Sequence, residues 1–328
     1  MNSPKTHRKT PGFSLVELLV AMAVLAIMGI VMVSIVGSVQ KVSRQTMAHA
    51  EQFRESRRAF DRINQRLSQA TLNVYYDYVN ASGQPRTSNN VTTFTPRNYA
   101  RVSELRYLQT NASAFGAPRG GEMKGQAVFF QSPTGRADTD TLAGLNTLLN
   151  TVGYYIEKGS DDGLRPPTAT KASERFRLFE LVEPTENLTV YTKTSGSANY
   201  SGTDWAGVPL SNTNYSHRLA DNIVALVFRA IYPDANGNWR TNVTYSSAPR
   251  GQPTQSVEEN NLPPQVGVTM IAVDEVSARR IAEMGLTLTD ANTDDELKEL
   301  EGFLITNGLG YRRFESVVSI GPAKWSTR

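Results

Sequence analysis

The chain contains no cysteine and only three histidines, His7, His49 and His217, in 328 residues. The lack of cysteine excludes disulfides, a cysteine nucleophile and thiolate ligands for a zinc site. An exported domain must then be held together by burial of its core, which a domain of roughly 250 residues can supply. His217 is alone in the body of the chain and cannot build a histidine-rich metal centre.

Familiar catalytic and nucleotide-binding motifs are missing as well. There is no Gly-x-Gly-x-x-Gly after a strand-like segment, no P-loop and no Gly-x-Ser-x-Gly. The net charge of +3 equals the charge carried by Lys5, Arg8 and Lys9, so the rest of the chain is close to neutral. Such a balance does not favour nucleic-acid binding. We therefore expect no enzymatic activity, no cofactor and no nucleic-acid partner.

A long apolar run near the N-terminus is the strongest signal in the chain. From Phe13 to Val36 the only charged side chain is Glu17. At about 1.5 Å per helical residue this run reaches roughly 36 Å, enough to cross a hydrocarbon core of about 30 Å. We predict a transmembrane helix over 13–39. A charge there costs on the order of 2.5–3.5 kcal/mol, so Glu17 needs compensation and is a functional residue.

The residues around the start of this run resemble a type IV prepilin signal. A basic leader ends in Gly12, Phe13 follows, and Glu17 is the fifth residue after the glycine. A secretory signal peptide would have its cleavage site after the apolar run instead. The resemblance implies a leader peptide over 1–12, cleavage by prepilin peptidase between Gly12 and Phe13, N-methylation of Phe13, and pairing of Glu17 with the amine of a neighbouring subunit. An uncleaved single-span anchor with an incidental glutamate is the alternative.

The helix is expected to continue beyond the span, over 40–75. Phe53, Phe60, Ile63, Leu67 and Ala70 recur at helical spacings and form one apolar stripe. We expect this stripe to dock on the protein's own head. A coiled-coil seam is the alternative, but it would cover fewer than about three heptads. A helix with a membrane half and a half packed on a head is the architecture that the resemblance to type IV pilins implies.

Residues 76–328 are expected to form a β-rich head. The fold class is then α+β, with the long helix packed on an antiparallel sheet. In Arg175–Leu181 polar and apolar residues alternate, as in a half-buried strand, and Asn222–Tyr232 is apolar enough for a central strand. Helices are predicted at Glu275–Met284 and Thr293–Asn307, the second with a capping box of Thr293 and Glu296. The other predicted strands are Val102–Gln109, Gln126–Gln131, Val152–Glu157, Arg175–Glu183, Leu188–Thr192, Val266–Asp274 and Arg312–Ile320.

Two further resemblances extend into the head. One is to the minor pseudopilin J class of type II secretion, which has a similar order of features in its head. These features are a strand over Leu219–Tyr232, then Trp239, then a Leu-Pro pair that leads into the strand Leu262–Met270. Segments along the chain, such as Ala127–Gln131 and Gly153–Glu157, most closely resemble the Verru_Chthon cassette protein C family of Verrucomicrobia.

The resemblance implies a non-enzymatic, membrane-anchored minor pseudopilin of a type II secretion or type IV pilus-like assembly. Its partners would be prepilin peptidase and other pilin-like subunits. It would be a single-pass inner-membrane protein, with a cytoplasmic N-terminus that fits the basic leader and a head that is periplasmic or, after assembly, extracellular. An anchored surface adhesin that never enters a fibre is the alternative. An exported enzyme on a pilin-like stalk would need a cleft with converging ionisable groups.

Two weaker signals concern ligands of the head. Some pseudopilin heads bind calcium, and oxygen-rich turns here contain Asp138, Asp140, Asp161 and Asp162. Such residues also suit turns for backbone reasons alone, so no metal site is assigned. A second group of residues could form a sugar- or cell-binding face or could simply pack loops: Tyr75, Tyr76, Tyr78, Tyr191, Tyr200, Trp205 and Tyr215.

Overall fold

The structure is a computed structural model that describes residues 15–325 except 85, 87–89, 143, 146, 161–173, 195–201, 251–254 and 289. For residues 41–52 it describes the backbone alone. The expected cleavage site at Gly12 and Phe13 therefore lies outside the described residues, as do Asp161, Asp162 and Tyr200. The chain divides into two units, 1–51 and 52–328, and each is described by itself.

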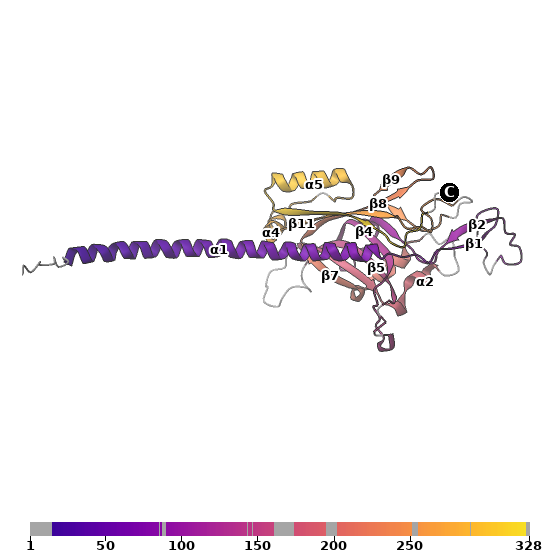
Figure 1. Cartoon of the computed structure of the whole chain (residues 1–328), viewed down its shortest axis with the longest axis horizontal. Helices are drawn as coiled ribbons and strands as arrows, with labels where there is room; N and C mark the ends of the chain where they lie inside the picture. The colour runs from indigo at the N-terminus through magenta and orange to yellow at the C-terminus, as the bar shows by residue number, and fades with distance from the viewer. Residues whose placement is uncertain are drawn as a thin grey trace, which may run out of the picture. The chain divides into compact units, whose positions relative to one another are not determined.

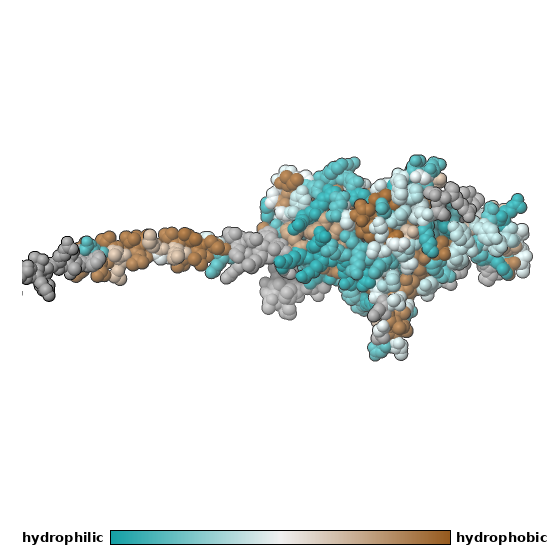
Figure 2. All heavy atoms as spheres, viewed as in Figure 1, coloured by the Kyte–Doolittle hydropathy of each residue, from teal (hydrophilic) through white to brown (hydrophobic). Residues whose placement is uncertain are grey.

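The first unit is the N-terminal part of α1, a helix over Leu15–Ser68. Its segment Leu15–Gln40 has a mean hydropathy of 2.9 and is not buried in the protein, so its length and composition suit a membrane span. Brown, hydrophobic side chains cover the visible side of this segment in Figure 2. The helix runs without interruption through Gly29 and Gly37, because no proline interrupts it and leucine, alanine and methionine favour helix.

The last part of α1 belongs to the second unit, the head. Ala59, Phe60, Ile63 and Leu67 are buried there, so the predicted stripe docks on the head. The prediction that the helix reaches residue 75 is wrong, because α1 ends at Ser68. The Thr71 N–H donates to the Gln131 carbonyl at 2.9 Å, which draws the chain into a β-bridge with the sheet. A run of Thr, Asn, Val and Tyr also has weak helix propensity.

The head contains two antiparallel sheets and a two-stranded ribbon (Figure 1). The six-stranded sheet has the order β10-β3-β4-β5-β6-β7, the four-stranded sheet has the order β12-β11-β8-β9, and β1 pairs with β2. The strands are β1 Tyr75–Val79, β2 Asn98–Val102, β3 Leu108–Asn111, β4 Glu122–Pro133, β5 Leu149–Ser160, β6 Glu174–Glu183, β7 Ser216–Asp221, β8 Ile223–Pro233, β9 Trp239–Asn242, β10 Tyr245–Ser246, β11 Gln265–Val273 and β12 Tyr311–Ser319. The helices of the head are α2 Thr189–Thr194, α3 Asp204–Ser211, α4 Glu275–Glu283 and α5 Asp294–Thr306, with short 3₁₀ turns at Ala112–Ala114, Asp140–Leu142, Thr185–Asn187 and Thr213–Tyr215.

The six-stranded sheet is buried on both faces, which explains its continuous apolar runs. Along β4, Phe130 faces the core that contains α1 and the four-stranded sheet, whereas its neighbour Phe129 faces a second core with Trp205 of α3. Gly153 of β5 lies opposite Phe129, and a Cβ there would come within 2.4 Å of the Phe129 ring. A larger residue at 153 would force that ring out of its place.

Most predicted elements are confirmed, including the antiparallel head and thus the α+β fold class. The predicted strand Leu188–Thr192 is wrong, because this stretch forms α2 instead. The Glu183 carboxylate accepts from the Thr189 N–H at 3.0 Å at the start of α2 and so favours the helix over local β propensity. The predicted strand Val102–Gln109 is only partly right, since β2 ends at Val102 and β3 begins at Leu108. The Asn73 side chain accepts from the N–H groups of Glu104 and Leu105 and holds the turn between them.

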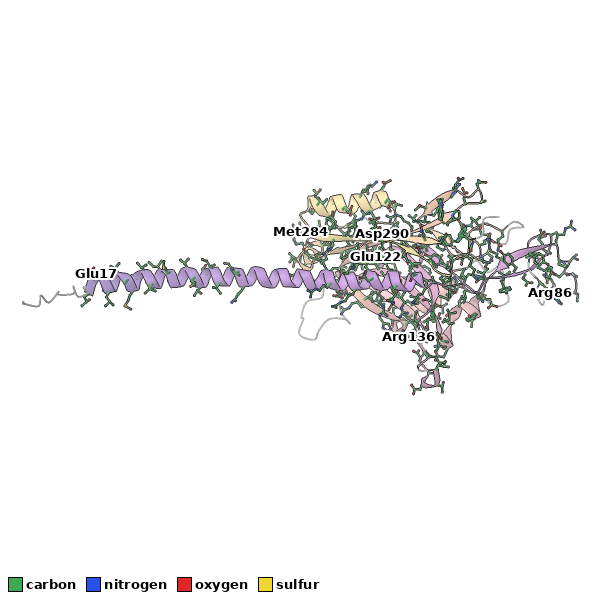
Figure 3. All side chains as sticks on the ribbon, viewed as in Figure 1. Glu17, Arg86, Glu122, Arg136, Met284 and Asp290 are labelled. Carbon is green, nitrogen blue, oxygen red and sulfur yellow. The ribbon has the colours of Figure 1, made fainter. Side chains whose placement is uncertain are left out.

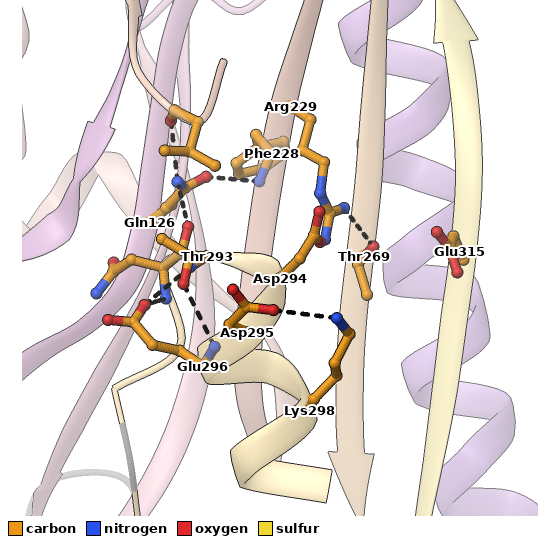
Figure 4. A network of polar contacts seen from close by, with 12 residues as sticks. Gln126, Phe228, Arg229, Thr269, Thr293, Asp294, Asp295, Glu296, Lys298 and Glu315 are labelled. Carbon is orange, nitrogen blue, oxygen red and sulfur yellow. Dashed lines mark hydrogen bonds and ion pairs between the residues drawn. The ribbon is translucent and has the colours of Figure 1, made fainter. Parts of the chain in front are cut away.

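The predicted capping box of α5 is confirmed. The Glu296 N–H donates to Thr293 Oγ1 at 3.3 Å, and the Thr293 N–H donates back to Glu296 Oε2 at 2.9 Å. Figure 4 shows the same helix start tied to the four-stranded sheet, where Arg229 of β8 donates to Thr269 of β11 and pairs with Asp294. Leu297, Leu300 and Leu304 of α5 are buried.

Candidate functional site

The N-terminal segment is the first candidate site. Glu17 lies in the first turn of α1, and Figure 3 shows it near the start of the described helix. A carboxylate at this end of a helix interacts favourably with the exposed N–H groups and the helix dipole. Its neighbours Leu15, Val16 and Leu18 are exposed. The segment therefore offers lipid a continuous apolar surface that carries a single acidic group near its beginning.

The acidic turns predicted as weak calcium candidates do not form a metal site in the described part of the head. Asp138 lies 3.9 Å from the Arg136 guanidinium, and its N–H donates to Glu186. Asp140 is exposed in a 3₁₀ turn. No group of three His, Asp or Glu side chains that could hold a metal occurs among the described residues. The Glu186 carboxylate accepts from its own N–H and from those of Thr139 and Asp138, and these bonds lower its pKa.

The aromatic residues that could form a binding face or pack loops divide between these two roles. Trp205 is only 2% exposed, because it faces the second core from α3. Tyr215 is half-buried under the Arg136 guanidinium. Tyr75, Tyr76 and Tyr78 on β1, and Tyr191 on α2, are exposed as expected.

The exposed tyrosines of β1 border a cavity of about 480 Å³, which we call the aromatic pocket. It is lined by the ribbon β1–β2, the turn between β8 and β9, and Trp325 near the end of the chain. Figure 1 shows the ribbon and β9 toward the same end of the head. The sequence reasoning missed Tyr99, Asn236 and Trp325. Period-2 alternation in Asn98–Val102 could have placed Tyr99 beside the β1 tyrosines only if the pairing of the two strands had been known.

A second cavity, of about 220 Å³, lies between β6 and α4. Its charged groups are paired with one another: Lys158 Nζ is 3.1 Å from Glu174, and Arg175 is 2.6 Å from Glu275. Because the Arg175 hydrogen bond and charge outweigh the effect of burial, the pKa of the Glu275 carboxyl falls below its ordinary value. These ion pairs join β5 to β6 and β6 to α4, so they stabilise the head.

Comparison with known proteins identifies one region of the chain. Residues 7–35 match the model of the prokaryotic N-terminal methylation motif, so the chain begins with a type IV pilin-like signal. The motif implies processing by prepilin peptidase and assembly with pilin-like subunits, and together with the apolar helix it is consistent with a membrane anchor. No curated protein and no solved structure has significant similarity to the chain.

Proposed function

We propose that the chain is a membrane-anchored, pilin-like minor pseudopilin of a type II secretion or type IV pilus-like assembly, and that it has no catalytic activity. The observation that carries the proposal is the methylation motif over residues 7–35, which overlaps the apolar segment Leu15–Gln40. A cleavable signal placed before an apolar helix leaves that helix in the mature protein. Anchoring and subunit contact are therefore its functions in this proposal.

The proposed mechanism has three steps. Prepilin peptidase cleaves after Gly12, and the new amine of Phe13 is methylated. The mature helix holds the subunit in the inner membrane, with its head on the opposite side from the leader. During assembly Glu17 pairs with the Phe13 amine of a neighbouring subunit, because opposite charges within about 4–6 Å stabilise each other strongly where water is scarce.

The finer assignment to the minor pseudopilin J class, or to the Verru_Chthon cassette protein C family, is also a proposal. The order of elements in the head supports the pseudopilin assignment. β8 has the aromatic residue Tyr232 just before its last residue, Pro233, while Trp239 begins β9, and Leu262 and Pro263 precede β11. This is the order on which the resemblance to the pseudopilin depends.

Processing is the first test. Native protein should begin at Phe13 by intact mass and N-terminal sequencing, with one additional methyl group on its amine. Gly12→Trp should leave the leader attached, whereas Gly12→Ala should retain much of the cleavage because alanine is also small. A mature protein that starts at Met1, or one cut beyond the apolar segment, would contradict the proposal.

Assembly is the second test, and it separates a fibre subunit from an anchored binding module. Glu17→Ala should still be inserted and cleaved, because the change makes the segment more apolar. It should no longer crosslink to partner pilin-like subunits in native membranes. Ser34→Ala, which also replaces a polar residue of the apolar segment by alanine but removes no charge, is the control and should crosslink normally. Unchanged crosslinks in Glu17→Ala would favour the anchored binding module.

A further inference from the structure

The aromatic pocket presents several aromatic side chains from the same surface of the ribbon. In the register of β1 and β2, Tyr76 lies opposite Arg101 and Tyr78 lies opposite Tyr99. Because strand residues two apart point to the same face, these four side chains share one face of the ribbon. The rings of Tyr78 and Tyr99 are 4.6 Å apart, and their hydroxyl groups are 2.9 Å apart.

Tyr76 and Tyr99 line the pocket and are both more than half exposed, at 58% and 65%. Trp325, which is near the C-terminal end of the sequence, also lines the pocket. The indole N–H of Trp325 donates to the Leu262 carbonyl at 2.5 Å, and the ring packs on Tyr232 at 5.9 Å. These contacts fix the ring as a rigid aromatic wall.

The charged groups of the pocket are already engaged within the head. The Asp234 carboxylate accepts from the N–H groups of Asn236 and Asn238 and from Arg240 Nε. These bonds, with the Arg240 contact first, lower the pKa of Asp234. The Arg101 guanidinium donates to the carbonyls of Ser256 and Glu259. The pocket therefore offers little unpaired charge to an ionic ligand.

Neutral polar groups remain available at its rim. Asn236 is exposed in the turn between β8 and β9, and its side-chain amide has no hydrogen bond within the described part of the chain. The Tyr76 hydroxyl likewise has no partner among the described residues. An amide and phenol groups both donate and accept hydrogen bonds, as hydroxyl-rich ligands require.

We propose that the aromatic pocket binds a neutral oligosaccharide. Tyr76, Tyr99 and Trp325 would pack against the apolar C–H faces of sugar rings, and the Asn236 amide would bond to hydroxyl groups. The volume falls within the range of about 300–1,000 Å³ that is usual for small-ligand sites, which are typically lined by aromatic groups with a few placed polar groups. A concave site with rigid aromatic walls fits a sugar chain better than the flat surface of a partner head. The site needs only the head, so it goes beyond the proposed function and does not depend on assembly.

The test uses full-length protein in detergent. The protein is applied to an array of neutral oligosaccharides that contain glucose, mannose and galactose. The oligosaccharide that retains most protein is then titrated into the protein while tryptophan fluorescence is recorded. We expect saturable binding. Tyr76→Ala and Tyr99→Ala should each weaken it about tenfold or more, as removal of a central aromatic contact does. Asn236→Ala, an exposed turn change that leaves the fold intact, should also weaken it.

Tyr75→Ala is the matched control, because Tyr75 is an exposed tyrosine next to Tyr76 in β1 and points to the opposite face. It should bind within about twofold of the unaltered protein. Thermal unfolding of each variant checks that the head remains folded. No retention of any neutral oligosaccharide by the unaltered protein overturns the proposal, and so does equal loss in Tyr75→Ala. If no sugar binds and the pocket variants lose crosslinks to partner subunits, the surface is a protein interface and the proposal is wrong.

Discussion

In the first part of α1, Leu25 and Ile27 are 69% and 64% exposed, whereas Ile63 and Leu67 in the last part are fully buried. The same residue types are used in both parts. Between 15 and 40 apolar residues cover the helix on all sides, and between 53 and 68 they are restricted to one stripe with arginines around it. The difference indicates two environments: lipid can surround the first part, and the head covers one face of the second.

The two regions also place their carboxylates in different surroundings. Glu17 stands near the start of the apolar segment. Glu180 of β6 is 2% exposed in the head, and the Arg62 guanidinium reaches it from α1 at 2.7 Å. The Tyr154 hydroxyl also donates to Glu180, at 2.8 Å. Arg62 Nε donates to the Glu180 carboxylate, and this hydrogen bond raises the pKa of Arg62, so the guanidinium keeps its charge beside the carboxylate. In the head, then, the charge that a buried carboxylate needs comes from the docked helix.

The largest expected effect is obtained by cutting the helix at two places. A fragment that begins at Phe53 lacks the apolar segment and should be soluble, monomeric and folded. A fragment that begins at Thr71 also lacks Phe60, Ile63 and Leu67, which are worth roughly 1.5–3 kcal/mol each when buried. Their combined loss approaches the total stability of an ordinary domain, about 5–15 kcal/mol. Urea unfolding of both fragments checks this. Equal stability would show that the helix does not contribute to the core of the head.

The second-largest effect is expected when a leucine is replaced by alanine in each part of the helix. Leu67→Ala should destabilise the head by about 2–5 kcal/mol, because it leaves a cavity in a packed core. Leu25→Ala should change unfolding of the head by less than about 0.5 kcal/mol, because its side chain lies outside that core. Urea unfolding of full-length protein in detergent, followed by tryptophan fluorescence to which the buried Trp205 contributes, measures both. Similar losses in the two variants would remove the distinction between the two parts.

The pair of Arg62 and Glu180 gives a smaller effect. Arg62→Met keeps an unbranched apolar stem but removes the guanidinium, and it leaves the Tyr154 hydroxyl as the partner of the Glu180 carboxylate. Because the Arg62 side chain is 47% exposed and screened by water, we expect a loss of only about 1–2 kcal/mol in urea unfolding.

Arg58→Met, one turn earlier on an exposed side of the same helix, is the control and should be close to neutral. Adding Glu180→Gln to Arg62→Met should recover part of the loss, since the buried charge is then gone. No recovery would mean that the loss in Arg62→Met does not come from the unpaired charge of Glu180.

Local patterns predicted much of this fold, and the failures have physical causes. The apolar run, the stripe Phe60–Leu67 and the alternation in Arg175–Leu181 are local signals, and each gave the right element. Leu188–Thr192 has strand propensity, but the Glu183 carboxylate from another element determines that it is helical. Trp205 was grouped with exposed aromatic residues, although it is buried in the second core, to which Phe129 also belongs. The aromatic pocket joins residues 76, 99, 236 and 325, and no local pattern connects such distant segments.

The smallest expected effect concerns a buried carboxylate without a guanidinium partner. Glu183 is fully buried, and burial raises the pKa of its carboxyl, while the hydrogen bonds from Thr189 oppose this rise without cancelling it. The folded state therefore binds this proton more tightly than the unfolded chain, so stability falls as pH rises from the ordinary value of 4.5 through the raised value. Glu183→Gln should remove that decline in urea unfolding between about pH 4 and pH 8. Glu186→Gln is the control of opposite sign. The N–H groups of Glu186 and Thr139 lower the pKa of the Glu186 carboxyl. The contribution of Glu186 to stability is therefore present above pH 4.5 and lost as pH falls. If stability still declines with rising pH in Glu183→Gln, another group titrates. The buried Glu183 carboxylate would then not destabilise the head.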